Sequence, residues 1–285
     1  MLEPITSVEE FKLNVDKRSR KLVSSFERAR KKADPESVHD LRKATRRLQV
    51  IVSVAGARHS TRKARKLNRR LRTIRHALGG WRDDDVMRES IASMQRGSAG
   101  AIERKFWGML KRQVAKDRRG TIRKFRKSAA ALKVTGLKRK VRRFVHHHAN
   151  SHSVLKDMRS ELENRLEKWH ESMKVFIEDP SPAALHAVRI KAKTLRYLID
   201  LCEDLFPSNI ETPFRDCLKE IQEKVGDWHD AMALRQRSSS RLSAVPKSSA
   251  RSISHRIKTI ELKKSVEARK LILDARRSSS AMRVA

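Results

Sequence analysis

The feature that most constrains this chain is a basic helical motif that occurs twice. Residues 38–48 read VHDLRKATRRL, and residues 185–195 read LHAVRIKAKTL. At 3.6 residues per turn, each stretch places apolar side chains on one face and cations on another. The predicted apolar faces are Val38, Leu41, Thr45, Leu48 and Val52 in the first copy and Leu185, Val188, Ala192, Leu195 and Ile199 in the second. Each motif therefore predicts an amphipathic helix whose cationic face suits a polyanion.

The two copies keep one spacing along the chain. His186 follows His39 by 147 residues, and Gly226 follows Gly79 by the same 147. The spacing predicts an internal duplication with halves 1–150 and 151–285, each containing four or more helices. Without a gap, this offset also places Pro35 on Pro182, Arg42 on Arg189, Leu48 on Leu195, Trp81 on Trp228 and Asp83 on Asp230.

Residues that interrupt helices are scarce. The chain has 9 glycines and 7 prolines in 285 residues, and alternating apolar runs typical of strands are hard to find. Turns should therefore be few and helices long. We predict an all-α fold.

Local signals set the expected helix boundaries. Asp34 and Pro35 suit the cap and first turn of a helix that runs to about Gly56. The next helix should end at Gly79-Gly80 through a glycine C-cap. Two segments are predicted to lack stable structure, namely a mobile loop at 238–249 and a disordered basic tail at 276–285.

The chain carries a large surplus of positive charge. Lys and Arg total 68 against 33 Asp and Glu, which gives a formal net charge of +35 and a pI near 11.1. Such a surplus destabilises the folded state through self-repulsion and is usually retained for an anionic partner. Three classes of partner are compatible with this charge: nucleic acid, an acidic membrane surface and a phosphate polymer.

Targeting and redox signals are weak. Two cysteines, Cys202 and Cys217, are too few for a disulfide framework of the secreted kind. We find no charged and then apolar leader, and no apolar run that approaches the roughly 18 residues of a membrane span. We therefore expect a cytoplasmic protein with no transmembrane segment.

The repeated motifs resemble those of the CHAD family, the conserved histidine α-helical domain, and the resemblance covers nearly the whole chain. The matching stretches are His39–Arg47, Leu78–Val86, His186–Tyr197 and Val225–Asp230. Three positions depart from the family pattern: Gln49 stands where a further arginine is common, Val225 replaces leucine, and His229 replaces asparagine.

The resemblance implies two helical bundles related by a pseudo-two-fold axis, with a basic surface that binds inorganic polyphosphate. Family members also occur fused to a triphosphatase-type CYTH domain or associated with polyphosphate granules. Cations spaced three and four residues apart on a helix can follow such a polymer, and arginine can donate to two oxygens at once.

We assign polyphosphate binding to the cations of both motif helices and of the helices that follow them. A charge run on an ordinary protein is more often a solvated face, but the net charge and the duplication favour a binding role here. The two rows are expected to form one continuous track. The predicted cations are Arg42, Lys43, Arg46, Arg47, Arg69, Arg72, Arg75, Arg189, Lys193, Arg196 and Lys219.

His39 and His186 stand at the start of the two basic rows and complete the predicted binding set. Each imidazole could donate to a phosphate oxygen, or it could hydrogen-bond and orient an acid such as Asp83 or Asp230. Both interpretations stay open. We expect the acids at these junctions to cap helix N-termini, where the helix dipole favours negative charge. The alternatives are that they orient the cationic side chains or coordinate a divalent ion that bridges to phosphate; they are Asp83, Asp84, Asp85 and Asp230.

No ligand-binding role is predicted for the clustered histidines or for two of the tryptophans. The histidines at 146–148 and 152 lack a completing cysteine or carboxylate, so no metal site is predicted. Trp81 and Trp228 are expected to pack in the core at the helix junctions.

Two further classes of function, nucleic-acid binding and catalysis, have weaker support in the sequence. Nucleic-acid binding would use the same cations, but no helix-turn-helix, zinc-finger or RNP signature supports more than weak nonspecific binding. An enzyme would need a glycine-rich phosphate loop, a two-metal carboxylate set or an activated nucleophile, and none is evident. We predict non-catalytic polyphosphate binding without a cofactor, with nonspecific nucleic-acid binding or a scaffold role at polyphosphate granules as alternatives.

Overall fold

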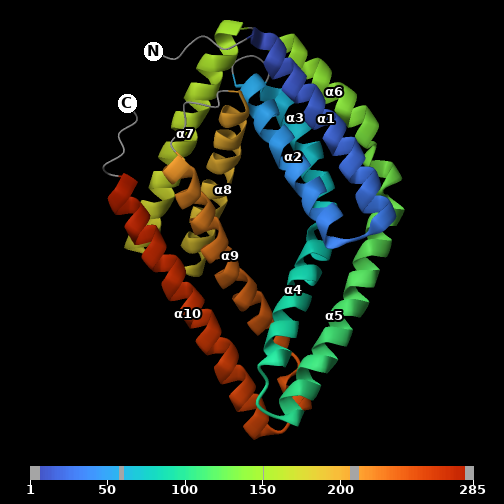
Figure 1. The fold of residues 1–285 in the computed structure, drawn as a ribbon, viewed down its shortest axis with the longest axis vertical. Helices are drawn as coiled ribbons and strands as arrows, with labels where there is room; N and C mark the ends of the chain where they lie inside the picture. Colours follow the sequence, from blue (N-terminus) through green and yellow to red (C-terminus); the bar gives the residue numbers. More distant parts are fainter. Residues whose placement is uncertain (1–6, 58–60, 150, 206–211, 280–285) are drawn as a thin grey trace. The chain divides into compact units, whose positions relative to one another are not determined.

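A computed structural model describes residues 7–57, 61–149, 151–205 and 212–279. Over these ranges the chain forms ten α-helices and two short 3-10 helices, η1 and η2, with no β-strand. The prediction of an all-α fold is therefore confirmed. The elements in chain order are α1 Ser7–Lys32, α2 Pro35–Ala55, α3 Thr61–Ala77, α4 Gly79–Arg96, α5 Ala101–Ser128, η1 Ala130–Leu132, α6 Val134–His148, α7 Ser151–Glu178, α8 Pro182–Leu205, α9 Thr212–Ser239, η2 Leu242–Ala244 and α10 Lys247–Ser279 (Figure 1).

The chain divides into two compact units, and each is assembled from three stretches of sequence. Unit 1 comprises Met1–Arg82, Thr121–Glu167 and Thr194–Arg215, and unit 2 comprises Asp83–Gly120, Lys168–Lys193 and Asp216–Ala285. Helices α4, α5, α7, α8 and α9 therefore contribute residues to both units. Each unit contains residues of both predicted halves, 1–150 and 151–285, and the duplication itself stays a prediction.

Helices at equivalent places in the two predicted halves begin at similar offsets. Helix α2 begins at Pro35 and α8 at Pro182, which is 147 residues later. Helix α5 begins at Ala101 and α10 at Lys247, which is 146 residues later. One difference stands out, because α3 and α4 are separate helices whereas α9 is continuous through Gly226. These offsets are consistent with the predicted duplication.

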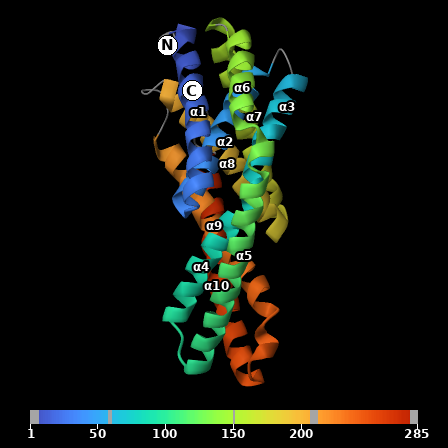
Figure 2. The same ribbon diagram turned by 90° about the vertical axis from the view of Figure 1, so that its right-hand side faces the viewer.

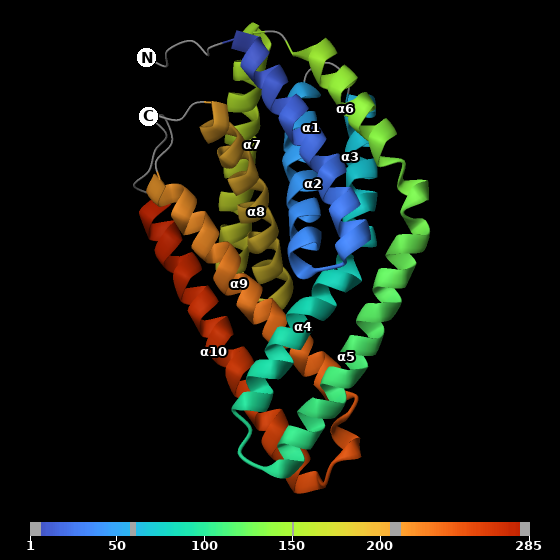
Figure 3. The same cartoon turned by 45° about the vertical axis from the view of Figure 1, so that its right-hand side comes forward.

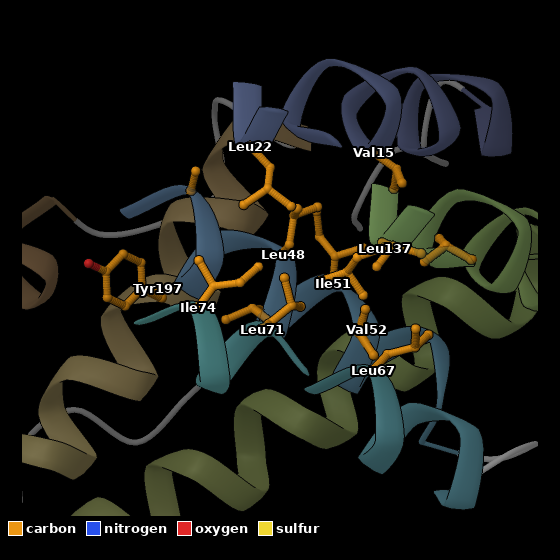
Figure 4. Packing of buried hydrophobic residues seen from close by; sticks show 14 of the residues in the cluster. Val15, Leu22, Leu48, Ile51, Val52, Leu67, Leu71, Ile74, Leu137 and Tyr197 are labelled. Carbon is orange, nitrogen blue, oxygen red and sulfur yellow. The ribbon is translucent and has the colours of Figure 1, made fainter. Parts of the chain in front are cut away.

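The core of unit 1 gathers buried residues of α1, α2, α3 and α6, with further residues from α5, α7 and α8. Helices α1, α2 and α3 run side by side, and α6 lies along α1 (Figures 1 and 2). Leucine and isoleucine side chains of α2 and α3 meet between these helices, with Leu48, Ile51, Leu71 and Ile74 all buried (Figure 4). This core fixes the orientation of α2 and therefore the direction of its basic face.

Both predicted apolar faces are confirmed. Val38, Leu41, Thr45, Leu48 and Val52 are buried on α2. Leu185, Val188, Ala192, Leu195 and Ile199 are buried on α8. Burial of a leucine-sized side chain contributes about 1.5–3 kcal/mol, so these faces decide how each helix is seated.

The start of α2 also follows the prediction. The Asp34 carboxylate accepts a hydrogen bond of 2.7 Å from the Ser37 backbone N–H, and Pro35 occupies the first turn. This hydrogen bond is the main reason that the pKa of Asp34 is lowered from 3.8. Gly56 is the C-cap of α2, as expected.

The junction between α3 and α4 differs from the prediction. Helix α3 ends at Ala77, and Gly79 and Gly80 are the first residues of α4 rather than a C-cap. No described glycine has a positive φ, so no left-handed cap forms here. The chain instead turns at Leu78, whose N–H donates to the Arg75 carbonyl over 3.2 Å and whose side chain is fully buried. The break between α3 and α4 therefore coincides with the burial of the Leu78 side chain in the core.

In unit 2, α9 and α10 run side by side after a short connection through η2 (Figure 3). An ion pair of 2.6 Å joins Arg235 of α9 to Glu261 of α10. A separate core gathers residues of α4, α5, α9 and α10, including Ile91, Trp107 and Ile257.

Both predictions for unstructured segments need correction where the structure describes them. Most of the predicted loop at 238–249 belongs to α9, η2 and α10, and Ser238 and Ile253 on either side of the connection are buried. Helix α10 continues to Ser279, so residues 276–279 of the predicted tail are helical. Residues 280–285 of that tail lie outside the described residues.

No helix within the described ranges combines the length and the apolarity needed to cross a membrane.

Candidate anion-binding site

The basic face of α2 lies in unit 1, away from the buried face of the helix. His39 is exposed at its start. The cations that follow are each half-buried, because the adjacent helices cover their aliphatic stems; they are Arg42, Lys43, Arg46 and Arg47. The acid in this motif, Asp40, pairs with α1, where it accepts a hydrogen bond from Arg28 and lies 3.5 Å from Lys21 Nζ.

Helix α3 adds a second pair of arginines to this face. Arg75 is half-buried and Arg72 is exposed. Burial, followed by repulsion from Arg46, Arg42 and Arg72, lowers the pKa of Arg75 to about 10. The guanidinium groups of Arg42, Arg46 and Arg72 therefore each act on that of Arg75, and we call these four residues the arginine cluster.

An aromatic ring from α8 completes the surroundings of the cluster. The Tyr197 ring centre lies 5.8 Å from Arg46 Cζ and 5.3 Å from Arg196 Cζ. Tyr197 is 7% exposed and belongs to the core of unit 1, and Figure 4 shows its hydroxyl directed away from the other labelled core residues. At these distances a guanidinium is attracted to the negative face of the ring. A tyrosine thus holds two cations without supplying a negative charge.

A carboxyl group lies near the remaining cations of the row. Burial raises the pKa of Asp200, while Arg196, Arg47 and Lys43 act in the opposite direction. These three cations therefore face an acid, whereas the groups that shift Arg75 are arginines and a tyrosine. The electrostatic surroundings of Arg75 therefore differ from those of Arg196, Arg47 and Lys43.

The second motif copy is divided between the units. Arg196, predicted to belong to the second basic row, lies in unit 1 with α2, while His186, Arg189 and Lys193 lie in unit 2. The prediction that both rows form one continuous track stays a prediction. Inside unit 1, however, Arg46 of the first copy and Arg196 of the second share Tyr197.

In unit 2, the second histidine has a neighbour that the sequence prediction missed. The rings of His186 and His229 lie 5.5 Å apart. Burial, His229 and Arg189 each lower the pKa of His186 from 6.5. The Arg189 guanidinium lies against Gly226 of α9, where an added Cβ would come within 3.4 Å of its Nη2. A Cβ at that distance would be in ordinary van der Waals contact, so α8 and α9 lie close together at this arginine.

The other predicted cations are more open. Arg69 on α3 and Lys219 on α9 are exposed. Exposed cations add long-range attraction for an anion, but they are less fixed in position than the half-buried ones.

The expected capping role of the acids at the α3–α4 junction is wrong. Because α4 begins at Gly79, its first turn contains no acid. Asp85 is instead buried and accepts a hydrogen bond from Arg118 of α5, which leaves it inside an ion pair of unit 2. In unit 2 the Asp230 carboxylate lies 3.7 Å from His229 Nδ1. An orienting partner for His186 is therefore the ring of His229.

Two tryptophans and the histidines near position 146 lie outside the predicted binding set. Trp81 and Trp228 are buried, which confirms their packing role. His146 Nε2 lies 3.1 Å from Asp16, which also accepts two hydrogen bonds of 2.6 Å from Arg142. Over the described ranges, no group of three or more histidine, cysteine, aspartate or glutamate side chains is arranged to hold a metal ion.

Comparison with known families decides the classification. The family model for the CHAD domain matches residues 15–239. The chain belongs to the CHAD family. No curated protein matches this chain.

Two solved structures share the CHAD fold of this chain. The crystal structure of the CHAD domain from the plant Ricinus communis is 17% identical, with a TM-score of 0.68 over 96% of this chain and 92% of that chain. PptA from Streptomyces chartreusis is 11% identical, with a TM-score of 0.75 over 96% of this chain and 99% of that chain. At these identities the likeness concerns the fold alone.

Proposed function

We propose that this CHAD protein binds inorganic polyphosphate without catalysing its turnover. The observation that carries the proposal is the arginine cluster, in which burial and then repulsion by the neighbouring arginines lower the pKa of Arg75 to about 10. Such crowding destabilises the unliganded fold, and a bound polyanion would relieve it. Membership of the CHAD family supports the choice of a phosphate polymer as the anion.

The donors in the cluster suit phosphate oxygens. Arg42 and Arg46 lie four residues apart on α2, about 6 Å along the helix axis. A guanidinium presents a planar pair of donors to two oxygens, which a lysine ammonium does not. The four arginines together therefore offer paired donors to successive phosphate units.

The remaining predicted residues fit the proposal as an outer set. Arg47, Lys43 and Arg196 lie near Asp200 and so carry partly compensated charge. Exposed Arg69 and His39 of unit 1 would extend the surface for a longer polymer. In unit 2, His186, Arg189, Lys193 and Lys219 are proposed as additional contacts for the same type of ligand. Association with polyphosphate granules would follow from such binding.

A titration tests the choice of ligand. Long-chain polyphosphate, duplex DNA and single-stranded RNA are titrated against the protein at matched, near-physiological salt, with fluorescence anisotropy as the readout. We expect polyphosphate to bind most tightly and both nucleic acids to compete weakly. Equal competition by either nucleic acid would replace the proposal with nonspecific polyanion binding.

A second assay tests the absence of catalysis. The protein is incubated with polyphosphate and Mg²⁺, and released phosphate is measured against a protein-free blank. We expect no release above the blank, because binding by arginine forks supplies no activated nucleophile. Steady release that scales with protein concentration would make the protein an enzyme.

A further inference from the structure

A glutamine of α2 connects two places on α3 within unit 1. Gln49 Nε2 donates a hydrogen bond of 3.2 Å to the Asn68 carbonyl, and Gln49 Oε1 accepts a hydrogen bond from Arg75 Nη1. Because the amide nitrogen is engaged by a carbonyl, the amide oxygen is the end that faces Arg75. Asn68 is itself held to α2, since its Nδ2 donates to Ser53 Oγ over 3.1 Å. The orientation of the Gln49 amide is therefore fixed by contacts on both helices.

The chemistry of this contact differs from that of an ion pair. A carboxylate at the same place would fix Arg75 equally well, but it would also cancel the charge that the neighbouring arginines repel. An amide oxygen accepts the hydrogen bond and carries no net charge. Arg75 consequently stays a full cation at a defined position, although Arg46, Arg42 and Arg72 surround it.

We propose that Gln49 is a positioning residue that holds the Arg75 guanidinium in place for phosphate while leaving its charge available. This inference rests on the proposed function, because it assigns a role within the polyphosphate site. A charged acceptor at this position would stabilise the cluster and weaken its attraction for a polyanion. Compared with a carboxylate, the amide therefore favours binding and gives a less stable fold.

The decisive variant is Gln49→Glu, which keeps an acceptor for Arg75 and adds a negative charge. We expect the melting temperature to rise, because the carboxylate offsets repulsion in the cluster. We expect polyphosphate affinity to fall roughly fourfold at 0.15 M salt, with a slope of log K against log salt that is shallower by about 0.7, as for the loss of one phosphate contact. A residue with a merely structural role would move stability and affinity in the same direction.

Two further variants separate charge from position. Gln49→Met has a similar volume and lacks the acceptor; we expect several-fold weaker binding with an unchanged salt slope, because the number of cations is the same. Gln236→Glu makes the same charge change at an exposed position of α9 in unit 2. We expect this control to retain the wild-type slope.

The outcomes distinguish this inference from the proposed function. Wild-type protein that fails to bind polyphosphate would overturn both. Wild-type binding together with an unchanged slope in Gln49→Glu would overturn the role of Gln49 alone. A fall of both melting temperature and affinity in Gln49→Glu would also overturn it, since Gln49 would then be needed only for folding; wild-type affinity in Gln49→Met would contradict the positioning step.

Discussion

The guanidinium carbon of Arg46 on α2 lies 5.8 Å from the centre of the Tyr197 ring on α8. Arg196 approaches the same ring at 5.3 Å. Since Tyr197 is buried in the core of unit 1, its ring gives these cations a rigid support. Residues from both motif copies therefore meet at one aromatic side chain inside a single unit.

This contact predicts that the ring matters for both stability and binding. Tyr197→Leu should lower the free energy of unfolding by about 1–3 kcal/mol, through lost packing and lost attraction to the two guanidinium groups. It should also weaken polyphosphate binding, because Arg46 and Arg196 lose their support. Urea unfolding and anisotropy titration measure the two effects. Tyr197→Phe keeps the ring and serves as the control; equal losses in both variants would show that the ring is not the supporting group.

Asp200 predicts a pH-dependent restraint on binding. Its pKa is raised above 3.8, chiefly by burial, and its ionised form faces Arg196, Arg47 and Lys43. Asp200→Asn removes a negative charge beside these cations, so we expect roughly threefold tighter polyphosphate binding at pH 7. As the pH falls and wild-type Asp200 takes up a proton, the two proteins should converge in affinity. A constant ratio between them at every pH would contradict the role of this charge.

The raised pKa of Asp200 also predicts how the free energy of unfolding changes with pH. A carboxyl whose pKa is raised on folding binds protons more readily in the folded state. The free energy of unfolding should therefore fall as the pH rises from the unfolded value through the raised folded value. Asp200→Asn should lack this decrease and be at least as stable as wild type at pH 7, as measured by urea unfolding across the window. Lower stability of the variant at pH 7 would contradict the raised pKa.

His186 offers a direct test of its two predicted roles. Its pKa lies below 6.5 in the free protein, so the free energy of unfolding should decrease as the pH falls below 6.5 towards the folded value. If the imidazole contacts phosphate, polyphosphate should raise the pKa of His186, because the anion favours the charged ring. NMR titration of the ring signals measures this shift. His170, whose pKa is lowered by burial alone, is the internal reference, and equal shifts of both histidines would indicate no direct contact.

Much of the local structure was predictable from the sequence. Asp34, Pro35 and Gly56 carried strong end signals for α2, because capping and φ restriction are local effects. The apolar periodicity identified the buried faces of α2 and α8 correctly. The break at Leu78 was not predictable from glycine chemistry, because the burial of a leucine in the core, not a left-handed glycine, accompanies it.

The candidate site was less predictable, because its contacts join distant parts of the chain. The basic face of α2 followed from spacing alone. Placement of Arg196 and Tyr197 beside Arg46 depends on how α8 packs in unit 1, which helical periodicity does not determine. The contact of Gln49 with Arg75 was also missed, although Gln49 departs from the family pattern and could have been singled out for that reason. His229 departs from the same pattern, and its ring lies beside that of His186.

Binding of polyphosphate by the arginine cluster is tested most directly by the salt dependence of affinity in two variants with equal loss of charge. The cluster variant carries Arg42→Gln, Arg46→Gln, Arg72→Gln and Arg75→Gln. The control replaces four exposed cations of α10 in unit 2 by glutamine, namely Arg251, Lys258, Lys263 and Lys270. Circular dichroism first establishes that both variants are folded.

We expect the slope of log K against log salt to become shallower by roughly 3 in the cluster variant, as for four lost contacts, while the α10 variant keeps the wild-type slope. Equal slopes and affinities in the two variants would contradict this expectation, because binding would then depend on net charge and not on the arginine cluster.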